Sequence, residues 1–152
     1  LEDDEDIIEH LEHIRSLQDE TGGFTAFIPW SFKKANTALD KRVKNEQGPN
    51  RYLRIMAVSR VFLDNFQHIQ ASWFSEGKKT GQVALHFGGD DFGGTLFDEN
   101  VMQEAGFYNR TTTDEVVALI REGGFIPVQR NTLYELIQHF DDLSSQPVAQ
   151  AL

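Results

Sequence analysis

A regular alternation of helix-like and strand-like segments along the chain most constrains its fold. Four short, β-favouring segments are set between turn residues, and amphipathic patterns of helical spacing separate them. The four predicted strands are residues 24–28, 68–74, 92–96 and 125–129. Because strands that alternate with helices are typical of parallel sheets with crossover connections, the sequence predicts an α/β fold.

The segments between the predicted strands carry recognisable helix ends. An acidic run precedes the first helix, Pro49 opens the second, and a capping box at residues 112–115 opens a later one, which stops at Gly123. The predicted helices cover about residues 2–21, 49–65, 77–85, 98–105 and 112–122, and a final helix starts at residues 133–137.

Four strands make either half of a (β/α) barrel or a small open sheet with unprotected edges. The chain also begins at Leu1 rather than at a methionine and opens directly into a helical pattern. We therefore expect a piece of a longer protein, whose sheet pairs with another half or with a second copy at its open edge. Residues 1–143 are predicted to form the half-barrel and residues 144–152 a tail.

The composition excludes several classes of function. The formal net charge is −10, and such an acidic protein repels the phosphate backbone of nucleic acids. The chain has no cysteine, which excludes disulfides, cysteine nucleophiles and iron–sulfur ligation by its own residues. Neither a membrane-spanning apolar run nor a secretory signal is visible, so we expect a cytoplasmic protein that binds no membrane.

The first candidate for a site is the stretch GGDDFGGT at residues 88–95, in which glycines frame Asp90 and Asp91. Two carboxylates in a glycine-rich loop can accept hydrogen bonds from ribose hydroxyls, hold an ammonium group or bind a divalent metal. Phosphate is a poor ligand because no lysine follows the glycines and the acids repel it. The structural alternative is a tight turn whose acids cap the next segment.

Further candidates lie where predicted strands end, because a parallel barrel carries its chemistry beyond the carboxyl ends of its strands. Trp30 and Trp73 could stack on an aromatic ring or base, and Arg130 could pair with a carboxylate. Their alternatives are interface packing for the tryptophans and a surface ion pair for the arginine. No catalytic residue and no metal site is predicted. The predicted substrate-binding residues are Trp30, Trp73, Asp90, Asp91, Gly93, Gly94, Thr95, Gln129 and Arg130.

Four segments together resemble a known enzyme family: GGFTAFIPW at residues 22–30, IQASW at 69–73, GGDDFGGT at 88–95 and PVQRNT at 127–132. They resemble the C-terminal region of radical S-adenosylmethionine enzymes of the menaquinone futalosine pathway and of deazaflavin synthesis. The resemblance runs from about Leu11 to Phe140. The Pro29–Trp30 pair favours the cyclic dehypoxanthine futalosine synthases, and the aminofutalosine and deazaflavin synthases are the alternatives.

The resemblance implies that the chain is the C-terminal half of a barrel whose absent N-terminal half carries a CxxxCxxC motif for a 4Fe–4S cluster. The complete enzyme would be a transferase that cleaves S-adenosylmethionine. It would act on a small nucleoside-type substrate, dehypoxanthine futalosine, and cyclise its ribose onto its benzoate ring. Asp90 or Asp91 would then contact a ribose hydroxyl or an ammonium group, Arg130 the benzoate carboxylate, and the tryptophans would wall the pocket.

On this reading the isolated chain binds neither S-adenosylmethionine nor the cluster, and it is inactive alone because it has no cluster cysteines. A second reading, from a different class of function, is a non-catalytic half-barrel that dimerises to cover its open edge.

Overall fold

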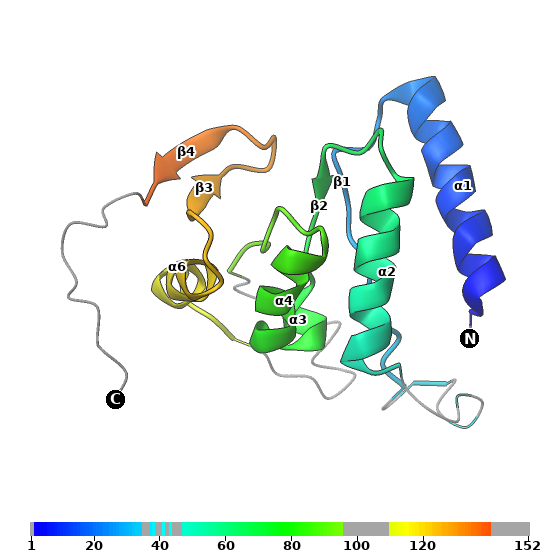
Figure 1. The fold of residues 1–152 in the computed structure, drawn as a ribbon, viewed down its shortest axis with the longest axis horizontal. Coiled ribbons are helices and arrows are strands. Elements are labelled where there is room, and N and C mark those ends of the chain that lie inside the picture. The colour runs from blue at the N-terminus through cyan, green and yellow to red at the C-terminus, as the bar shows by residue number, and fades with distance from the viewer. Residues whose placement is uncertain are drawn as a thin grey trace.

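The computed structural model describes residues 2–34, 37–38, 41, 43, 47–95 and 110–140. Helices and short strands alternate through these ranges (Figure 1). The elements are α1 (Asp4–Thr21), β1 (Ala26–Phe27), α2 (Pro49–Phe62), β2 (His68–Ile69), α3 (Trp73–Glu76), α4 (Lys78–Ala84), the 3-10 helix η1 (Leu85–Phe87), α6 (Thr113–Glu122), β3 (Val128–Arg130) and β4 (Leu136–His139). The predicted helix at residues 98–105 and the predicted tail lie outside the described residues.

Local chemistry sets the helix ends as the sequence predicts. The Asp3 carboxylate caps α1, accepting hydrogen bonds from the N–H groups of Glu5 and Asp6 at 2.9 and 3.0 Å. The helix ends at Gly22, which takes a left-handed conformation with φ 57°. Pro49 begins α2 at a position where a missing N–H costs nothing. The Thr112 hydroxyl caps α6 by accepting from the N–H of Glu115.

The first two strands are parallel, as expected for an α/β fold. Ala26 pairs with His68 and Phe27 with Ile69, and a parallel bridge between Gln70 and Asp91 extends the arrangement by one residue pair. The other two strands, β3 and β4, form a separate antiparallel pair. The α/β class and the parallel pairing of the first two strands are thus confirmed, whereas a half-barrel of four parallel strands stays a proposal.

The prediction of a final helix starting at residues 133–137 is wrong, because this segment turns and enters β4. The Asn131 side-chain oxygen accepts hydrogen bonds from the N–H groups of Leu133 and Glu135, at 2.9 and 3.1 Å. Tyr134 takes a left-handed backbone conformation with φ 63°. A helix cannot run through a left-handed residue, so the turn folds the chain back as a hairpin.

The second predicted strand is shorter than expected, and the third, predicted at residues 92–96, forms no strand over its described residues 92–95. Pairing in β2 covers His68 and Ile69, and the chain enters the short helix α3 at Trp73. The carbonyl of Ser72 accepts hydrogen bonds from the N–H groups of Ser75 and Glu76 and so closes this helical turn.

Among the described residues, the buried side chains form three clusters around the helices. One lies between α2 and β2 and includes Tyr52, Met56 and Ile69, and another joins α1 to the end of α2. The third centres on Trp73, which stacks on Phe92 with ring centroids 6.5 Å apart. Helix α2 contributes to two of these clusters, in agreement with the wide apolar face of its sequence.

Alkaline pH is expected to destabilise this core through Tyr52. The residue is 1% exposed, and burial raises the pKa of its hydroxyl to about 12. The hydroxyl also accepts a hydrogen bond from the N–H of Ser72 at 2.8 Å. Because an unfolded tyrosine ionises near about pH 10, the stabilising contribution is complete below that pH and is lost between there and the folded pKa.

We therefore predict that the free energy of unfolding falls by about 2 kcal/mol more in the wild-type chain than in Tyr52→Phe as the pH rises from about 10 to about 12. Urea unfolding across this range, followed by circular dichroism, measures the difference. Equal slopes for the two proteins would contradict the prediction.

Candidate functional site

The glycine-framed stretch at residues 88–95 directly follows η1, and within it Asp91 forms the parallel bridge to Gln70. Gly88 has φ 100°, and a Cβ atom there would lie 2.5 Å from the Cβ of Arg60. Gly93 has φ 87°, and a Cβ atom there would lie 2.9 Å from the side-chain nitrogen of Gln70. Both glycines are therefore required by backbone conformation and by close packing, before any ligand is considered.

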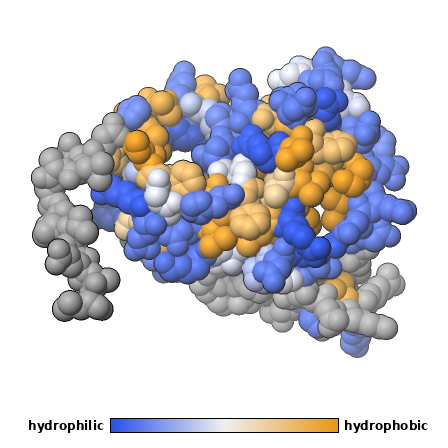
Figure 2. Space-filling view, in the orientation of Figure 1, coloured by the Kyte–Doolittle hydropathy of each residue, from blue (hydrophilic) through white to orange (hydrophobic). Residues whose placement is uncertain are grey.

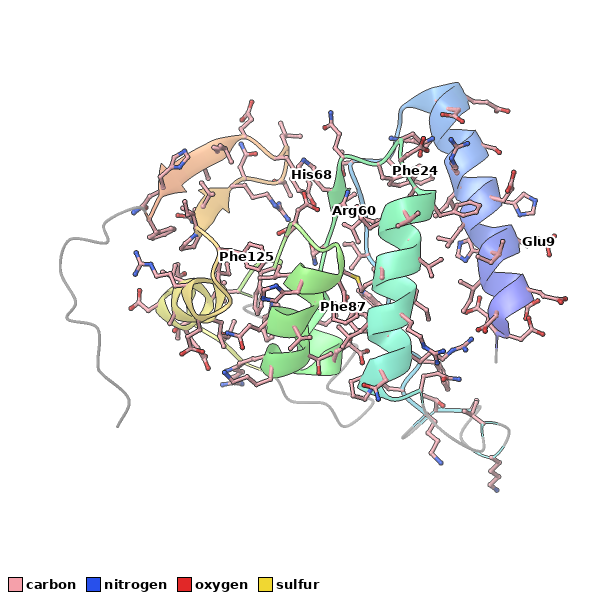
Figure 3. The ribbon with its side chains drawn as sticks, in the orientation of Figure 1. Glu9, Phe24, Arg60, His68, Phe87 and Phe125 are labelled. Atoms are coloured by element: carbon pink, nitrogen blue, oxygen red, sulfur yellow. The ribbon has the colours of Figure 1, made fainter. Side chains whose placement is uncertain are left out.

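Asp90 is held by three neighbours near the start of β2. Its Oδ1 atom accepts hydrogen bonds from the N–H of Ile69 at 2.7 Å and from the Arg60 guanidinium at 2.5 Å. Its Oδ2 atom lies 2.6 Å from Nδ1 of His68. Arg60 also donates to the carbonyl of Gly88 at 2.7 Å, so the arginine ties the glycine turn to α2. Figure 3 shows Arg60, near the C-terminal end of α2, and His68, at the start of β2, in the same upper part of the molecule.

Asp91 is held by a second set of partners, two from the β3–β4 hairpin and one from the glycine-framed stretch itself. Its Oδ2 atom accepts from Nε and Nη2 of Arg130 and, at 2.8 Å, from the hydroxyl of Tyr134. Its Oδ1 atom accepts from the N–H of Gly93 at 2.9 Å. The Asp91 side chain is only 10% exposed. The carboxylate therefore exchanges water for four hydrogen bonds from the protein, two of them from one guanidinium.

Tyr134 joins the two acids into one network. Its ring stacks on the His68 ring with centroids 3.9 Å apart. The guanidinium carbon of Arg130 also lies 3.9 Å from the centroid of the Tyr134 ring. Burial and the hydrogen bond that the Tyr134 hydroxyl donates to Asp91 raise the pKa of this hydroxyl. The network anchors the hairpin turn to the start of β2, and neither histidine nor tyrosine was predicted to take part.

A cavity of about 610 Å³ adjoins this network. Apolar side chains of α6, such as Val116 and Ile120, form one wall, and the hairpin with the glycine-framed stretch forms the others. Figure 2 shows the molecule hollowed beneath the hairpin, toward the left of the view. Seven of the predicted site residues line this single cavity, namely Asp90, Asp91, Gly93, Gly94, Thr95, Gln129 and Arg130.

The two tryptophans do not line the cavity. Trp73 was predicted to stand exposed at a strand end, and this is wrong, because α3 turns the side chain into the core, where it is 0% exposed. Trp30 is 54% exposed and packs edge-to-face on Phe74 with centroids 5.0 Å apart. Trp30 lies outside the cavity that the two acids line, and Trp73 is in the core, so the structure does not assemble acids and tryptophans into one wall.

The charges of the network satisfy one another. Arg60 pairs with Asp90, and Arg130 pairs with Asp91. Within the described ranges no group of three potential metal ligands is present, and the oxygen atoms of both acids are occupied by protein donors. Arg130 does not present a free fork for a substrate carboxylate. The arrangement holds the hairpin against the sheet and so gives the cavity its shape.

The sequence model described as CofH/MqnC C-terminal region matches residues 21–143, which is most of the chain. The chain belongs to this family. The predicted resemblance is thereby confirmed. Among the described residues, no helix is both long and apolar enough to span a membrane.

Several curated relatives of this family member cover nearly all of its length. The chain is 46% identical over 141 residues to the cyclic dehypoxanthine futalosine synthase of Streptomyces coelicolor. The alignment covers 93% of the chain and 35% of that relative. It is 41% identical to the 5-amino-6-(D-ribitylamino)uracil–L-tyrosine 4-hydroxyphenyl transferase of Methanopyrus kandleri, over 88% of the chain and 37% of the relative.

A third relative is the aminodeoxyfutalosine synthase of Streptomyces coelicolor, at 35% identity over 88% of the chain and 38% of the relative. The family member thus spans between 35% and 38% of the length of these three proteins.

The two adjacent glycines at 93 and 94 are predicted to differ sharply in their tolerance of a side chain. Gly93→Ala should lower the free energy of unfolding by about 1–2 kcal/mol, because φ is positive and Gln70 blocks the new Cβ atom. Gly94→Ala is the matched control, with nothing within 4 Å of its Cβ position, and should change it by less than about 0.5 kcal/mol. Thermal and urea unfolding measure both, and similar losses in the two variants would contradict the prediction.

The two acids are also predicted to differ in their contribution to stability. Asp91→Asn should lower the free energy of unfolding by about 2–4 kcal/mol, because it leaves the part-buried Arg130 without a counter-charge. Asp90→Asn, at a side chain that is 39% exposed, should lower it by about 1 kcal/mol. Amide hydrogen exchange in β3 and β4 should accelerate only in Asp91→Asn. Exchange that stays unchanged in the hairpin would show that the acid does not anchor it.

Proposed function

We propose that this chain is the C-terminal, substrate-side portion of a radical S-adenosylmethionine enzyme that cyclises dehypoxanthine futalosine in menaquinone biosynthesis. The observation that carries the proposal is a comparison within one organism. The chain is 46% identical to the cyclic dehypoxanthine futalosine synthase of Streptomyces coelicolor and 35% identical to the aminodeoxyfutalosine synthase of the same organism. Membership of the family supports the enzyme class, and the difference in identity favours the cyclising substrate.

In this proposal the sheet is completed by the remaining part of a barrel. The parallel pairing of β1 with β2, and the parallel bridge at Asp91, support one half of a parallel barrel. Phe24 and Ile28, on either side of β1, are 38% and 40% exposed and would be covered by a further strand. The additional length of the relatives provides material for that half.

The residues of this chain do not fit a 4Fe–4S cluster, because such clusters are held by cysteine thiolates and the sequence has none. The cluster of the proposed enzyme is therefore held by residues outside this chain. The role left to this chain is to bind, orient and enclose the substrate.

The cavity supplies the substrate-facing surface in this proposal. Thr95 and Gln129 line it, and their side chains are not part of the charged network, so they are the polar groups that we assign to the substrate. Direct contact between Arg130 and a substrate carboxylate would require the guanidinium to leave Asp91. We therefore assign the ion pair to shaping the cavity, and the apolar wall of α6 to excluding water from it.

A pair of chimeras tests the proposal. Residues of this chain replace the matching segment of the Streptomyces coelicolor cyclic dehypoxanthine futalosine synthase, and in a second protein they replace that of its aminodeoxyfutalosine synthase. We expect the first chimera to convert dehypoxanthine futalosine to its cyclised product. We expect the second to lose its own product because its substrate wall no longer fits. Product formation is measured by liquid chromatography and mass spectrometry.

Formation of 5′-deoxyadenosine from S-adenosylmethionine serves as the internal control, because it reports an intact N-terminal half in each chimera. The isolated chain should form none. The proposal is contradicted when the first chimera cleaves S-adenosylmethionine without cyclising the substrate while the second makes its own product.

A further inference from the structure

The segment after β1 is fastened to the segment after β2 by three contacts, which follow the same order along both segments. The Ser72 hydroxyl donates to the carbonyl of Pro29 at 3.0 Å. The Trp30 ring packs edge-to-face on Phe74 at 5.0 Å between centroids. The Lys33 ammonium lies 3.3 Å from a carboxylate oxygen of Glu76. Residues 29–33 are thereby tied along the length of α3.

The last of these contacts is a buried ion pair. The side chains of Lys33 and Glu76 are 9% and 3% exposed, whereas those of the surface pair Lys79–Glu122 are 76% and 59% exposed. Burying two charges costs solvation free energy that their attraction only partly offsets, so a buried pair is a weak source of net stability. Its effect is geometric, because the charges can pair in few arrangements.

The pair lies where a parallel fold places its ligands. Strands β1 and β2 run in the same direction, so their carboxyl ends meet at one edge of the sheet, and ligands bind beyond such ends. Trp30 follows the end of β1 by three residues, and Ser72 follows the end of β2 by the same distance. The Asp90 contacts lie alongside β2 itself, at His68 and Ile69.

The Trp30 side chain is held in place by a neighbouring ring and is also exposed to solvent. Its ring is held by Phe74, and the residue nevertheless remains 54% exposed. Tryptophan rings stack on planar aromatic groups, and a ring whose position is already fixed loses little conformational freedom on binding.

We propose that Trp30 is a stacking platform for a planar aromatic ring of the ligand, and that the Lys33–Glu76 ion pair is the device that positions it. The inference rests on the proposed function for the identity of the ring, the benzoate ring of dehypoxanthine futalosine. Trp30 contacts the ligand, whereas Glu76 acts through Lys33 and is a positioning residue.

Tryptophan fluorescence of the full chain tests the platform without requiring turnover. The chain has two tryptophans, and Trp73 is completely buried, so a ligand-dependent signal comes from Trp30. Titration with dehypoxanthine futalosine, and separately with benzoate, should give saturable quenching in the wild-type chain and none in Trp30→Phe. Absence of saturable quenching by either probe overturns the platform.

Matched variants test the positioning role. Glu76→Gln should weaken binding about three- to tenfold and lower the fluorescence anisotropy of Trp30, because the loop is less constrained. Glu122→Gln, which removes the carboxylate of the surface pair, should change neither. Lys33→Arg keeps the charge and should restore wild-type values that Lys33→Met loses. Equal affinity and anisotropy in Glu76→Gln and Glu122→Gln overturn the positioning role.

The outcomes separate this inference from the proposed function. Quenching at Trp30 together with an inactive first chimera would leave the platform standing and reject the cyclase assignment. A cyclising first chimera together with no quenching would leave the cyclase assignment standing and reject the platform.

Discussion

The carboxylate of Asp91 is the point at which sheet, turn and hairpin meet. The main-chain carbonyl of Asp91 accepts a hydrogen bond from the N–H of Ala71 at 2.7 Å and so extends the parallel arrangement of β2. Its side chain binds Arg130, Tyr134 and the N–H of Gly93. A carboxylate withdrawn from water requires such donors, and here they come both from the hairpin and from the glycine-framed stretch. The turn therefore cannot change shape without affecting the hairpin, and the shape of the cavity between them depends on the Asp91 carboxylate.

The features of the fold that could be predicted from the sequence are those fixed by neighbouring residues. The cap at Thr112, the proline that begins α2 and the glycine that ends α1 act within a few residues, and the structure has them as expected. The hairpin could not be predicted in the same way. Its apolar residues have helical spacing, but the Asn131 side chain and the left-handed Tyr134 decide the conformation, and contacts to distant Asp91 hold it.

The same distinction applies to the candidate site. Glycines around two acids mark an unusual backbone, so the stretch at 88–95 could be singled out, and it does line the cavity. His68 and Tyr134 carry no local signal, because their stacking joins residues that are far apart in the chain. Trp73 was misplaced because the strand pattern at 68–74 hides the early start of α3, which turns the indole into the core.

The charged pairs and the exposed tryptophan occupy different parts of the molecule. The pairs Arg60–Asp90 and Arg130–Asp91 lie alongside β2 and the residues that follow it, where they fasten the turn and the hairpin. Trp30 lies beyond the carboxyl end of β1, fixed on one side and exposed on the other. An acidic turn that suggests a ligand site in the sequence is therefore better explained as the clamp that shapes the cavity. The less conspicuous Trp30, packed on Phe74 beside the buried Lys33–Glu76 pair, is the residue that we propose as the ligand contact.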